Sequence, residues 1–233
     1  QARPALEKGE PVEIRMPMVR QLQVNTEIGM TFAGALRSIL RQAPAVVLVG
    51  EIRDEETARI ACQAALTGHL VLSTLHTNDA PGAVGRLRDM GCPPFAINAA
   101  LAGVLAQRLL RRNCTHCVRP ETPDELLLRR FGLAPGVEGL VRGSGCGKCM
   151  SSGFRGRLAV TELFAMNREL QVLVEEGAAA AAVREAAIRA GMRPMWRDGL
   201  EKALMGFTTL DEVGRTVGVS AEELSPPRLG QAA

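Results

Sequence analysis

The sequence predicts an α/β protein built on a mostly parallel sheet, with a zinc-binding insertion and a helical carboxyl-terminal region. Strand-like apolar runs alternate with helix-like segments over residues 31–90, and the links between them are short. Two C-x2-C pairs lie between residues 113 and 153, and most of the chain after residue 166 has a helical composition. These observations divide the chain into a sheet-forming part, a cysteine-containing part and a helical part.

The first part begins with a loose alternation that suggests two short strands broken at Pro17. Thr31 is a suitable N-cap for the first helix, and Asp54 opens an acidic first turn suited to a helix N-terminus. The first buried strand is uniformly apolar, as in a strand covered on both faces. The expected elements are two strands within 10–24, a helix over 31–42, a strand over 45–49, a helix over 54–66, a second buried strand over 69–76, and a helix from 78 or 79 to 90.

The composition of the chain changes after Arg112, where two cysteine pairs bracket a segment that contains proline and glycine. The expected elements are a helix over 124–131, a strand over 155–166, helices over 168–176, 178–190 and 195–205, and a last helix from Thr209. The tail from Ser225 is expected to be disordered. The predicted domains are 1–112 for a partial sheet domain, 113–153 for the insertion, 154–224 for the strand and helices, and 225–233 for the tail.

Composition excludes some functions. The net charge is only +3, Tyr is absent, and no charge block marks a nucleic-acid surface, so no nucleic-acid partner is expected. This argues against a zinc-ribbon nucleic-acid binder. Two stretches without charged residues, 60–78 and 90–107, approach the length of a membrane span but contain polar residues or paired prolines, so we interpret them as core segments. No signal-peptide pattern opens the chain, and a soluble cytoplasmic fragment is expected.

Polar side chains follow both buried strands. Glu51 comes after Gly50 at the end of the first, and His76 lies at the end of the second. In open parallel sheets, ligands bind beyond the carboxyl ends of the strands. Glu51 could orient an attacking water in a nucleotide hydrolase, or it could only begin the next helix. His76 could contact a terminal phosphate, or it could pack on the surface. His69, at the opposite end of its strand, is expected to be structural.

The segments around Glu51 and His76 resemble motifs of a known protein family. VLVGEIRDEETA resembles the Walker B region of the type II secretion and type IV pilus assembly ATPases, and TGHLVLSTLHTNDA resembles their histidine box. The match covers most of residues 30–117. The resemblance implies a RecA-like core, a hexameric ring, ATP with Mg²⁺ held between subunits or domains, and inner-membrane platform proteins as partners. It also implies that Glu51 is the catalytic carboxylate, that His76 contacts the γ-phosphate, and that Arg53 and Asp54 complete the Walker B signature.

The chain also departs from the family pattern. The upstream aspartate box is GEPVE here, so Gly9 replaces the first acid, Glu10 replaces the aspartate and Glu13 is kept. The phosphate loop G-x-x-x-x-G-K-[ST] does not occur in these 233 residues. We therefore expect a carboxyl-terminal part of a motor that does not hydrolyse ATP alone. The alternative is a non-hydrolysing, zinc-containing adaptor or pseudo-ATPase subunit of the same machinery.

The four cysteines of the two C-x2-C pairs are the candidate metal ligands. They are Cys114, Cys117, Cys146 and Cys149, with residues 118–145 between the pairs. Two such pairs can close a tetrahedral Zn²⁺ site, and four thiolates leave no open position, so the metal would be structural. Free thiols are the alternative. His116 is a possible but unneeded ligand, and the other two cysteines, Cys62 and Cys92, are expected in the core. The set also resembles the tetracysteine element of the secretion and pilus-extension branch.

Several arginines are candidates for phosphate or intersubunit contacts, because one subunit's arginine can complete a neighbour's site in a ring motor. They are Arg37, Arg41, Arg53, Arg86 and Arg88. The alternative for each is a solvated helix face. Only Arg53 is favoured for a site role, through its position near Glu51 and the family resemblance.

Overall fold

The computed structural model describes the backbone of residues 3–7 and all of residues 16–24 and 30–218. The chain forms two compact units. The first runs to Val104 and includes Phe164–Gly191, and the second combines Leu105–Leu163 with the chain from Met192. The domain boundaries at residues 112, 153 and 224 stay a prediction, and the tail lies outside the described residues.

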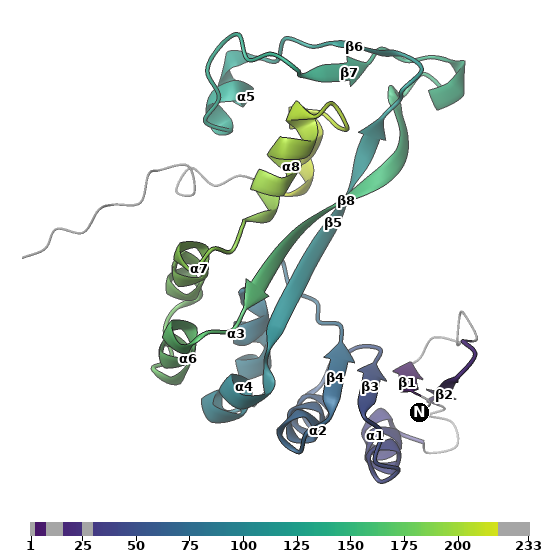
Figure 1. The fold of residues 1–233 in the computed structure, drawn as a ribbon, viewed down its shortest axis with the longest axis vertical. Coiled ribbons are helices and arrows are strands. Elements are labelled where there is room, and N and C mark those ends of the chain that lie inside the picture. Colours follow the sequence, from purple (N-terminus) through teal and green to yellow (C-terminus); the bar gives the residue numbers. More distant parts are fainter. Residues whose placement is uncertain (1–2, 8–15, 25–29, 219–233) are drawn as a thin grey trace, which may run out of the picture. The chain divides into compact units, whose positions relative to one another are not determined.

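The first unit contains a parallel sheet, as predicted. Its strands are β1 (Arg3–Glu7), β2 (Val19–Gln23), β3 (Val46–Val49) and β4 (Leu70–Ser73), in the spatial order β2-β1-β3-β4 (Figure 1). The sequence did not predict β1. The strand expected before Pro17 falls mainly on residues outside the described part, and β2 follows a turn at Pro17.

The helices of the first unit begin within two residues of the predicted starts, with two exceptions. They are α1 (Phe32–Leu40), α2 (Glu55–Leu66), α3 (Gly82–Asp89), α4 (Pro94–Ala100), α6 (Arg168–Glu175) and α7 (Ala180–Arg189). Thr31 caps α1 by accepting from the Gly34 N–H. The predicted start of α3 at 78 or 79 is wrong, because Pro81 is its N-cap residue. Helix α4, which begins with prolines, was not predicted.

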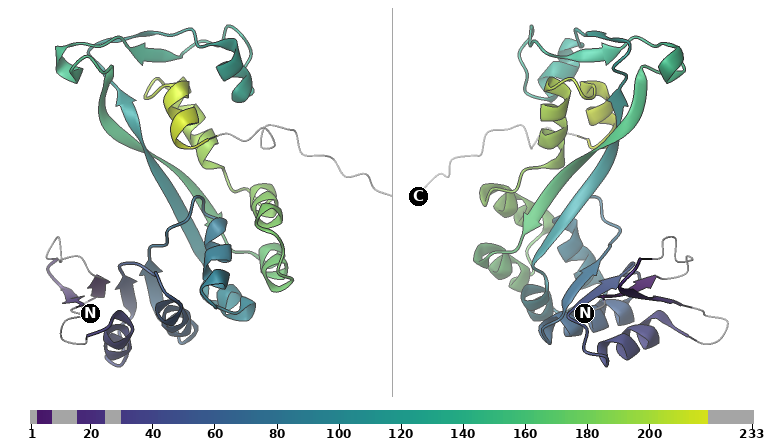
Figure 2. Two further views of the ribbon diagram at one scale, coloured as in Figure 1. Left: turned by 180° about the vertical axis from the view of Figure 1, so that it is seen from behind. Right: turned by 45° about the vertical axis from the view of Figure 1, so that its right-hand side comes forward.

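The sheet of the first unit is covered less completely than the sequence predicted. Val47 and Val49 are fully buried, and α2 contacts β4 (Figure 2). Side chains that alternate with these buried valines face the other side of the sheet. There, Leu48, Leu70 and Leu72 are 36%, 56% and 48% exposed. The predictions of a first strand covered on both faces and a second buried strand are therefore wrong for the described residues.

The second unit contains most of a two-stranded sheet, a small antiparallel pair and helices. The strands are β5 (Gly103–Asn113) paired with β8 (Phe154–Ala165), and β6 (Val118–Pro120) paired with β7 (Val141–Gly143). The helices are α5 (Glu125–Arg130), the short 3-10 helix η2 (Gly147–Cys149), α8 (Met195–Leu204) and α9 (Leu210–Thr216). Only β8, α5, α8 and α9 were predicted. Within the described residues, each helix is too short or too polar to cross a bilayer.

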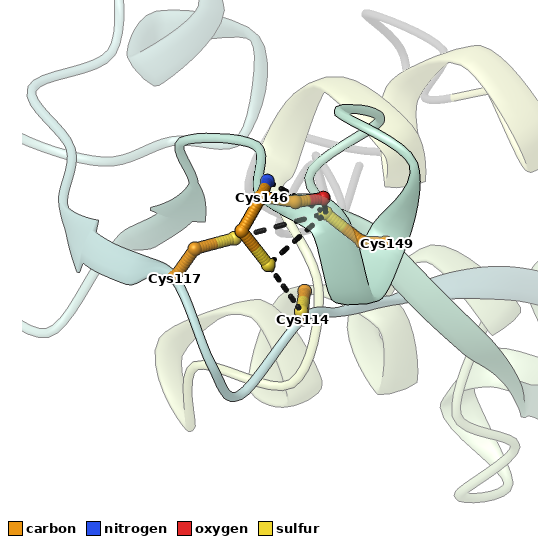
Figure 3. Close-up of side chains that lie close together, drawn as sticks. All are labelled: Cys114, Cys117, Cys146 and Cys149. Atoms are coloured by element: carbon orange, nitrogen blue, oxygen red, sulfur yellow. Dashed lines mark hydrogen bonds between the residues drawn. The ribbon is translucent and has the colours of Figure 1, made fainter.

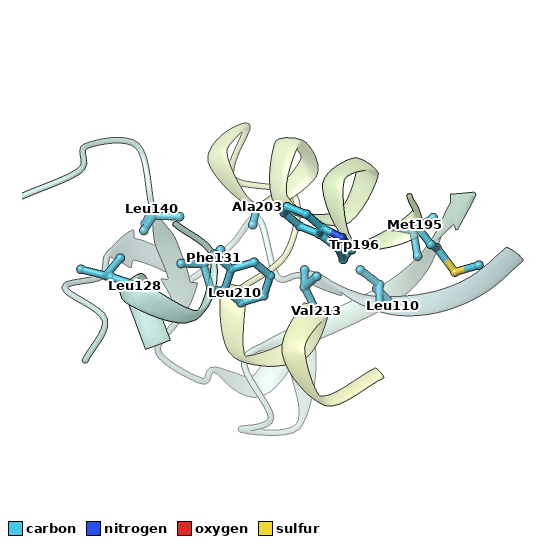
Figure 4. Close-up of a cluster of buried hydrophobic side chains, with 10 residues drawn as sticks. Leu110, Leu128, Phe131, Leu140, Met195, Trp196, Ala203, Leu210 and Val213 are labelled. Carbon is cyan, nitrogen blue, oxygen red and sulfur yellow. The ribbon is translucent and has the colours of Figure 1, made fainter. Parts of the chain in front are cut away.

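A hydrophobic cluster forms the core of the second unit. Phe131 of the α5 end, Trp196 of α8 and Leu210 of α9 meet in it, together with side chains of β5 and β8 (Figure 4). Fully burying one apolar side chain of this size stabilises the folded state by roughly 1.5–3 kcal/mol. The cluster therefore packs α5, α8 and α9, which are distant from one another in sequence, against β5 and β8. These two strands precede and follow the segment that contains the cysteine pairs.

A buried carboxylate lies beside this core. Glu212 of α9 accepts hydrogen bonds from the backbone N–H of Arg111 and from Nε of the same residue, both at 3.0 Å. Arg215 also donates to it. Burial alone would raise the pKa of Glu212, but the hydrogen bonds from Arg111 and Arg215 outweigh this and lower the pKa below its ordinary value. The carboxylate is therefore held ionised inside the unit.

Candidate functional site

The carboxyl ends of β3 and β4 meet at one edge of the sheet. Val49 of β3 pairs with Ser73 of β4, so the segments that follow leave the sheet side by side. The Thr74 hydroxyl donates to the carbonyl of Gly50 at 2.7 Å, and the Ile52 N–H donates to the carbonyl of Thr74 at 3.1 Å. These bonds fix the two segments that carry Glu51 and His76. No local sequence pattern indicates this role for Thr74.

Glu51 and His76 are in contact at this edge. The Oε1 atom of Glu51 lies 2.7 Å from Nε2 of His76, and its Oε2 atom accepts a hydrogen bond from Arg53 Nε. The Glu51 side chain is only 13% exposed, whereas that of His76 is 83% exposed. Apart from this contact with His76, the buried Oε1 atom has no hydrogen-bond partner among the described residues. A buried carboxylate oxygen in this state is suited to accept a hydrogen bond from a bound water.

The other predicted nucleotide-associated residues do not all join this contact. Asp54 is the N-cap of α2, and its Oδ1 accepts from the Thr57 N–H at 2.8 Å. Glu10 and Glu13 lie outside the described residues. The structure thus brings Glu51, His76 and Arg53 together.

The remaining candidate arginines have other surroundings. Arg37 pairs with Glu56 at 2.8 Å. Arg41 donates to the Ser38 hydroxyl at 3.1 Å, and Arg88 donates to a carbonyl of the α6–α7 link at 3.5 Å. Arg86 lies in the last turn of α3. None of these contacts involves Glu51 or His76.

His69 has the structural position that the sequence predicted. Its Nδ1 atom lies 3.0 Å from the carbonyl of Ala64 in the last turns of α2, and 3.2 Å from the Thr67 hydroxyl. The His69 ring therefore contacts the last turn and the C-cap residue of α2.

The second candidate site is the tetracysteine cluster, formed by Cys114, Cys117, Cys146 and Cys149. All four Sγ atoms lie within 4.8 Å of one another. Cys114 and Cys117 follow β5, Cys146 precedes η2 and Cys149 is its last residue, and the four side chains turn toward a common centre (Figure 3). All four thiols are free.

The spacing of the sulfurs fits a tetrahedral metal site. The Cys114–Cys146 and Cys117–Cys149 Sγ separations are 3.9 Å, and the Cys146–Cys149 separation is 3.8 Å. A tetrahedron with Zn–S bonds of about 2.3 Å has edges of about 3.8 Å. The donor set and these separations therefore fit Zn²⁺. His116 is not part of the cluster, because its Nε2 atom lies 3.3 Å from Arg155 Nη1.

The thiols of the cluster differ in acidity. Burial raises the pKa of Cys149, but the N–H groups of Cys146 and Gly153 and the neighbouring thiols outweigh this and lower the pKa to about 6. Burial and the neighbouring thiols raise the pKa of Cys117 to about 11. A bound cation would favour the thiolate form of the cluster cysteines.

Cys62 and Cys92 are core residues, as predicted. Both are buried, with their Sγ atoms 3.7 Å apart. Burial raises the pKa of Cys62 to about 12. Both are free thiols.

The fold and these two sites define an α/β protein with a Glu–His contact at the carboxyl edge of a parallel sheet and a cluster of four cysteines that could hold a metal ion. A family model described as "Type II/IV secretion system protein" matches residues 6–215, and the chain belongs to this family. The chain is 51% identical over 212 residues to the type IV pilus assembly ATPase PilB of Thermus thermophilus, covering 89% of this chain and 24% of that protein. It is 50% identical over 208 residues to the type II secretion system ATPase E of Vibrio cholerae, covering 88% and 41%.

A solved structure supports the same assignment of fold. The crystal structure of the pilus retraction motor PilT with bound ADP superimposes with a TM-score of 0.60 at 26% identity, covering 97% of this chain and 52% of that chain. The predicted α/β fold and family resemblance are therefore confirmed. The chain spans about a quarter to two fifths of the length of these two relatives.

Proposed function

We propose that this chain is the carboxyl-terminal part of a hexameric ATPase that powers type II protein secretion or type IV pilus assembly. The family membership and the printed names of the relatives support the class of activity. The observation that carries the proposal is the 2.7 Å contact between the buried Oε1 atom of Glu51 and Nε2 of His76, at the carboxyl edge of a parallel sheet.

In this proposal each residue at the edge has a defined task. Glu51 accepts a hydrogen bond from the attacking water and orients it, and Arg53 holds the other carboxylate oxygen in place. His76 contacts the terminal phosphate through its exposed ring. Asp54, Glu10 and Glu13 are the further nucleotide- or magnesium-associated residues. When bound, ATP with Mg²⁺ supplies the phosphoryl group and neutralises its charge.

We propose that another part of a longer protein supplies the phosphate loop. The exposed Leu48, Leu70 and Leu72 favour this, because a sheet face with adjoining exposed leucines is suited to be covered by further structure. The proposed partners are other subunits of the ring and inner-membrane platform proteins of the secretion or pilus machine. The proposed location is therefore the cytoplasmic side of the inner membrane, reached through those partners.

The tetracysteine cluster is proposed to hold a structural zinc ion. The sulfur separations and the set of four thiols support this assignment. A metal with four protein ligands has no position for a substrate, so it would stabilise the second unit without taking part in hydrolysis.

The decisive experiment is steady-state ATP hydrolysis by the longer protein with Glu51→Gln. We expect kcat to fall by about 100-fold or more, with KM nearly unchanged, because the carboxylate acts on water and not on nucleotide binding. Glu56→Gln is the matched control, because Glu56 is exposed and pairs with Arg37 on the surface. The 233-residue chain alone should stay at background. Normal kcat in the Glu51→Gln protein would refute the proposed role.

One sequence feature favours the second candidate, a non-hydrolysing zinc-containing adaptor or pseudo-ATPase subunit. Gly9 stands where the family pattern has an acid. Reading the DNA upstream separates the two functions: an in-frame phosphate loop supports the ATPase, and a stop codon supports the adaptor.

A further inference from the structure

The segment that carries His76 is fastened at its far end by Asp79. This segment, residues 74–80, leaves β4 and leads to α3. The Oδ1 atom of Asp79 accepts from the N–H of Gly82, the first residue of α3, at 2.8 Å. The Oδ2 atom accepts from Arg184 Nη1 of α7, also at 2.8 Å. Asp79 therefore connects the histidine segment to two helices.

The Asp79–Arg184 pair is partly withdrawn from water. The side chains are 37% and 22% exposed, respectively. The ion pair between Arg189, also on α7, and Glu169 has a similar length, 2.8 Å, but both of its side chains are more than half exposed. Because water screens the Asp79–Arg184 pair less, it should hold its geometry better than the surface pair does.

Gly82 leaves the space that the Asp79 carboxylate occupies. A Cβ atom at Gly82 would lie 2.6 Å from Asp79 Oδ1, which is closer than such atoms approach in real structures. The Thr77 hydroxyl adds a further bond inside the segment, to the carbonyl of Asp79 at 2.8 Å. The chain around His76 is thus folded against Asp79.

His76 itself has little packing to hold it. Its side chain is 83% exposed and its polar contact is with Glu51. The position of the ring therefore depends on the backbone, which is fixed before His76 by the Thr74–Gly50 bond and after it by Asp79. Releasing either end would let the imidazole leave Glu51.

We propose that Asp79 and Arg184 are positioning residues for His76, and that they couple helix α7 to the Glu51 carboxylate. The path runs from Arg184 through Asp79 and the short histidine segment to the His76–Glu51 contact. A movement of α7 would then change the position of the imidazole. The importance of this coupling for hydrolysis rests on the function proposed above, whereas the positioning is a property of the folded chain.

The test is NMR on the full 233-residue chain, which contains only three histidines. His76→Gln identifies the His76 ring signals. In Arg184→Gln, we expect these signals to move toward those of an imidazole without a carboxylate contact. We also expect the amide hydrogens of residues 77–80 to exchange with solvent about five- to tenfold faster. This is the effect of losing one interaction about as strong as a helix N-cap. Arg184→Lys, which retains the charge, should restore part of both effects.

Arg189→Gln is the matched control, because it removes an exposed ion pair from the same helix. It should leave the His76 signals and the exchange of the segment unchanged. Asp79→Asn keeps an oxygen for the Gly82 amide and removes only the charge, so it tests the pair independently should Arg184→Gln fold poorly. Unchanged His76 signals in either folded variant would overturn the positioning role. Failure of the proposed function would instead show as normal kcat in Glu51→Gln.

Discussion

Replacing one cysteine of the tetracysteine cluster by serine should abolish tight zinc binding. The sulfur separations of 3.8–3.9 Å correspond to edges of the ligand tetrahedron. The centre of a tetrahedron lies about 0.61 of an edge from each vertex, which gives metal–sulfur distances of about 2.3–2.4 Å. Cys117→Ser would leave three thiolates and a hydroxyl that stays protonated, so one ligand position would be lost.

The bound metal should also stabilise the fold. Zinc that binds only the folded chain adds about 4 kcal/mol when free zinc exceeds the dissociation constant a thousandfold. For a chain of this size, that corresponds to about 8–16 °C in Tm. Cys117→Ser, or a strong chelator added to the wild type, should therefore lower Tm by an amount in this range.

Metal analysis, X-ray absorption and thermal unfolding measure these effects. We expect one zinc ion per chain, surrounded by a single shell of sulfur atoms at about 2.3–2.4 Å. Cys62→Ala is the control for thiol loss, because Cys62 lies in the first unit and is not one of the four clustered cysteines, so the variant should keep its zinc. Wild-type protein that carries well under one equivalent after gentle purification, or full zinc in Cys117→Ser, would refute the reasoning.

Two further predictions concern stability. Glu212→Gln should destabilise the chain by about 2 kcal/mol at pH 7 in urea unfolding, less than for a fully buried pair because Arg111 is partly exposed. Because the folded pKa of Glu212 is lowered, this difference exists above the ordinary pKa of a glutamate and disappears as the pH falls through the folded pKa. An equal difference at pH 7 and pH 2 would contradict this. Asp54→Ala removes the N-cap of α2 and should cost about 1 kcal/mol, with faster amide exchange in the first turn of α2; unchanged exchange there would count against it.

The parallel sheet was predictable because its signals are local. Thr31 and Thr209 cap helices at the positions where the sequence places them. The β3 segment is short, β-branched and bounded by Pro44 and Gly50, which favours a strand. The proximity of Glu51 and His76 also followed from strand ends that share one edge of the sheet.

Other features could not be read from local patterns. β5 combines apolar residues with arginines, and its alternating exposure depends on pairing with β8 far along the chain. The exposure of Leu70 depends on which face of the sheet the helices cover. Asp79 and Arg184 are 105 residues apart, so their contact has no signal in a single sequence. These are tertiary effects that propensity does not encode.

The buried position of Cys62 and Cys92 simplifies chemical work on the intact protein. Alkylating reagents attack thiolates that solvent can reach, and these two thiols are buried with raised pKa values. Of the six cysteines, the two that solvent partly reaches, Cys117 and Cys146, both belong to the cluster. The extent of rapid labelling before and after removal of metal would then report the fraction of molecules that carry a metal ion.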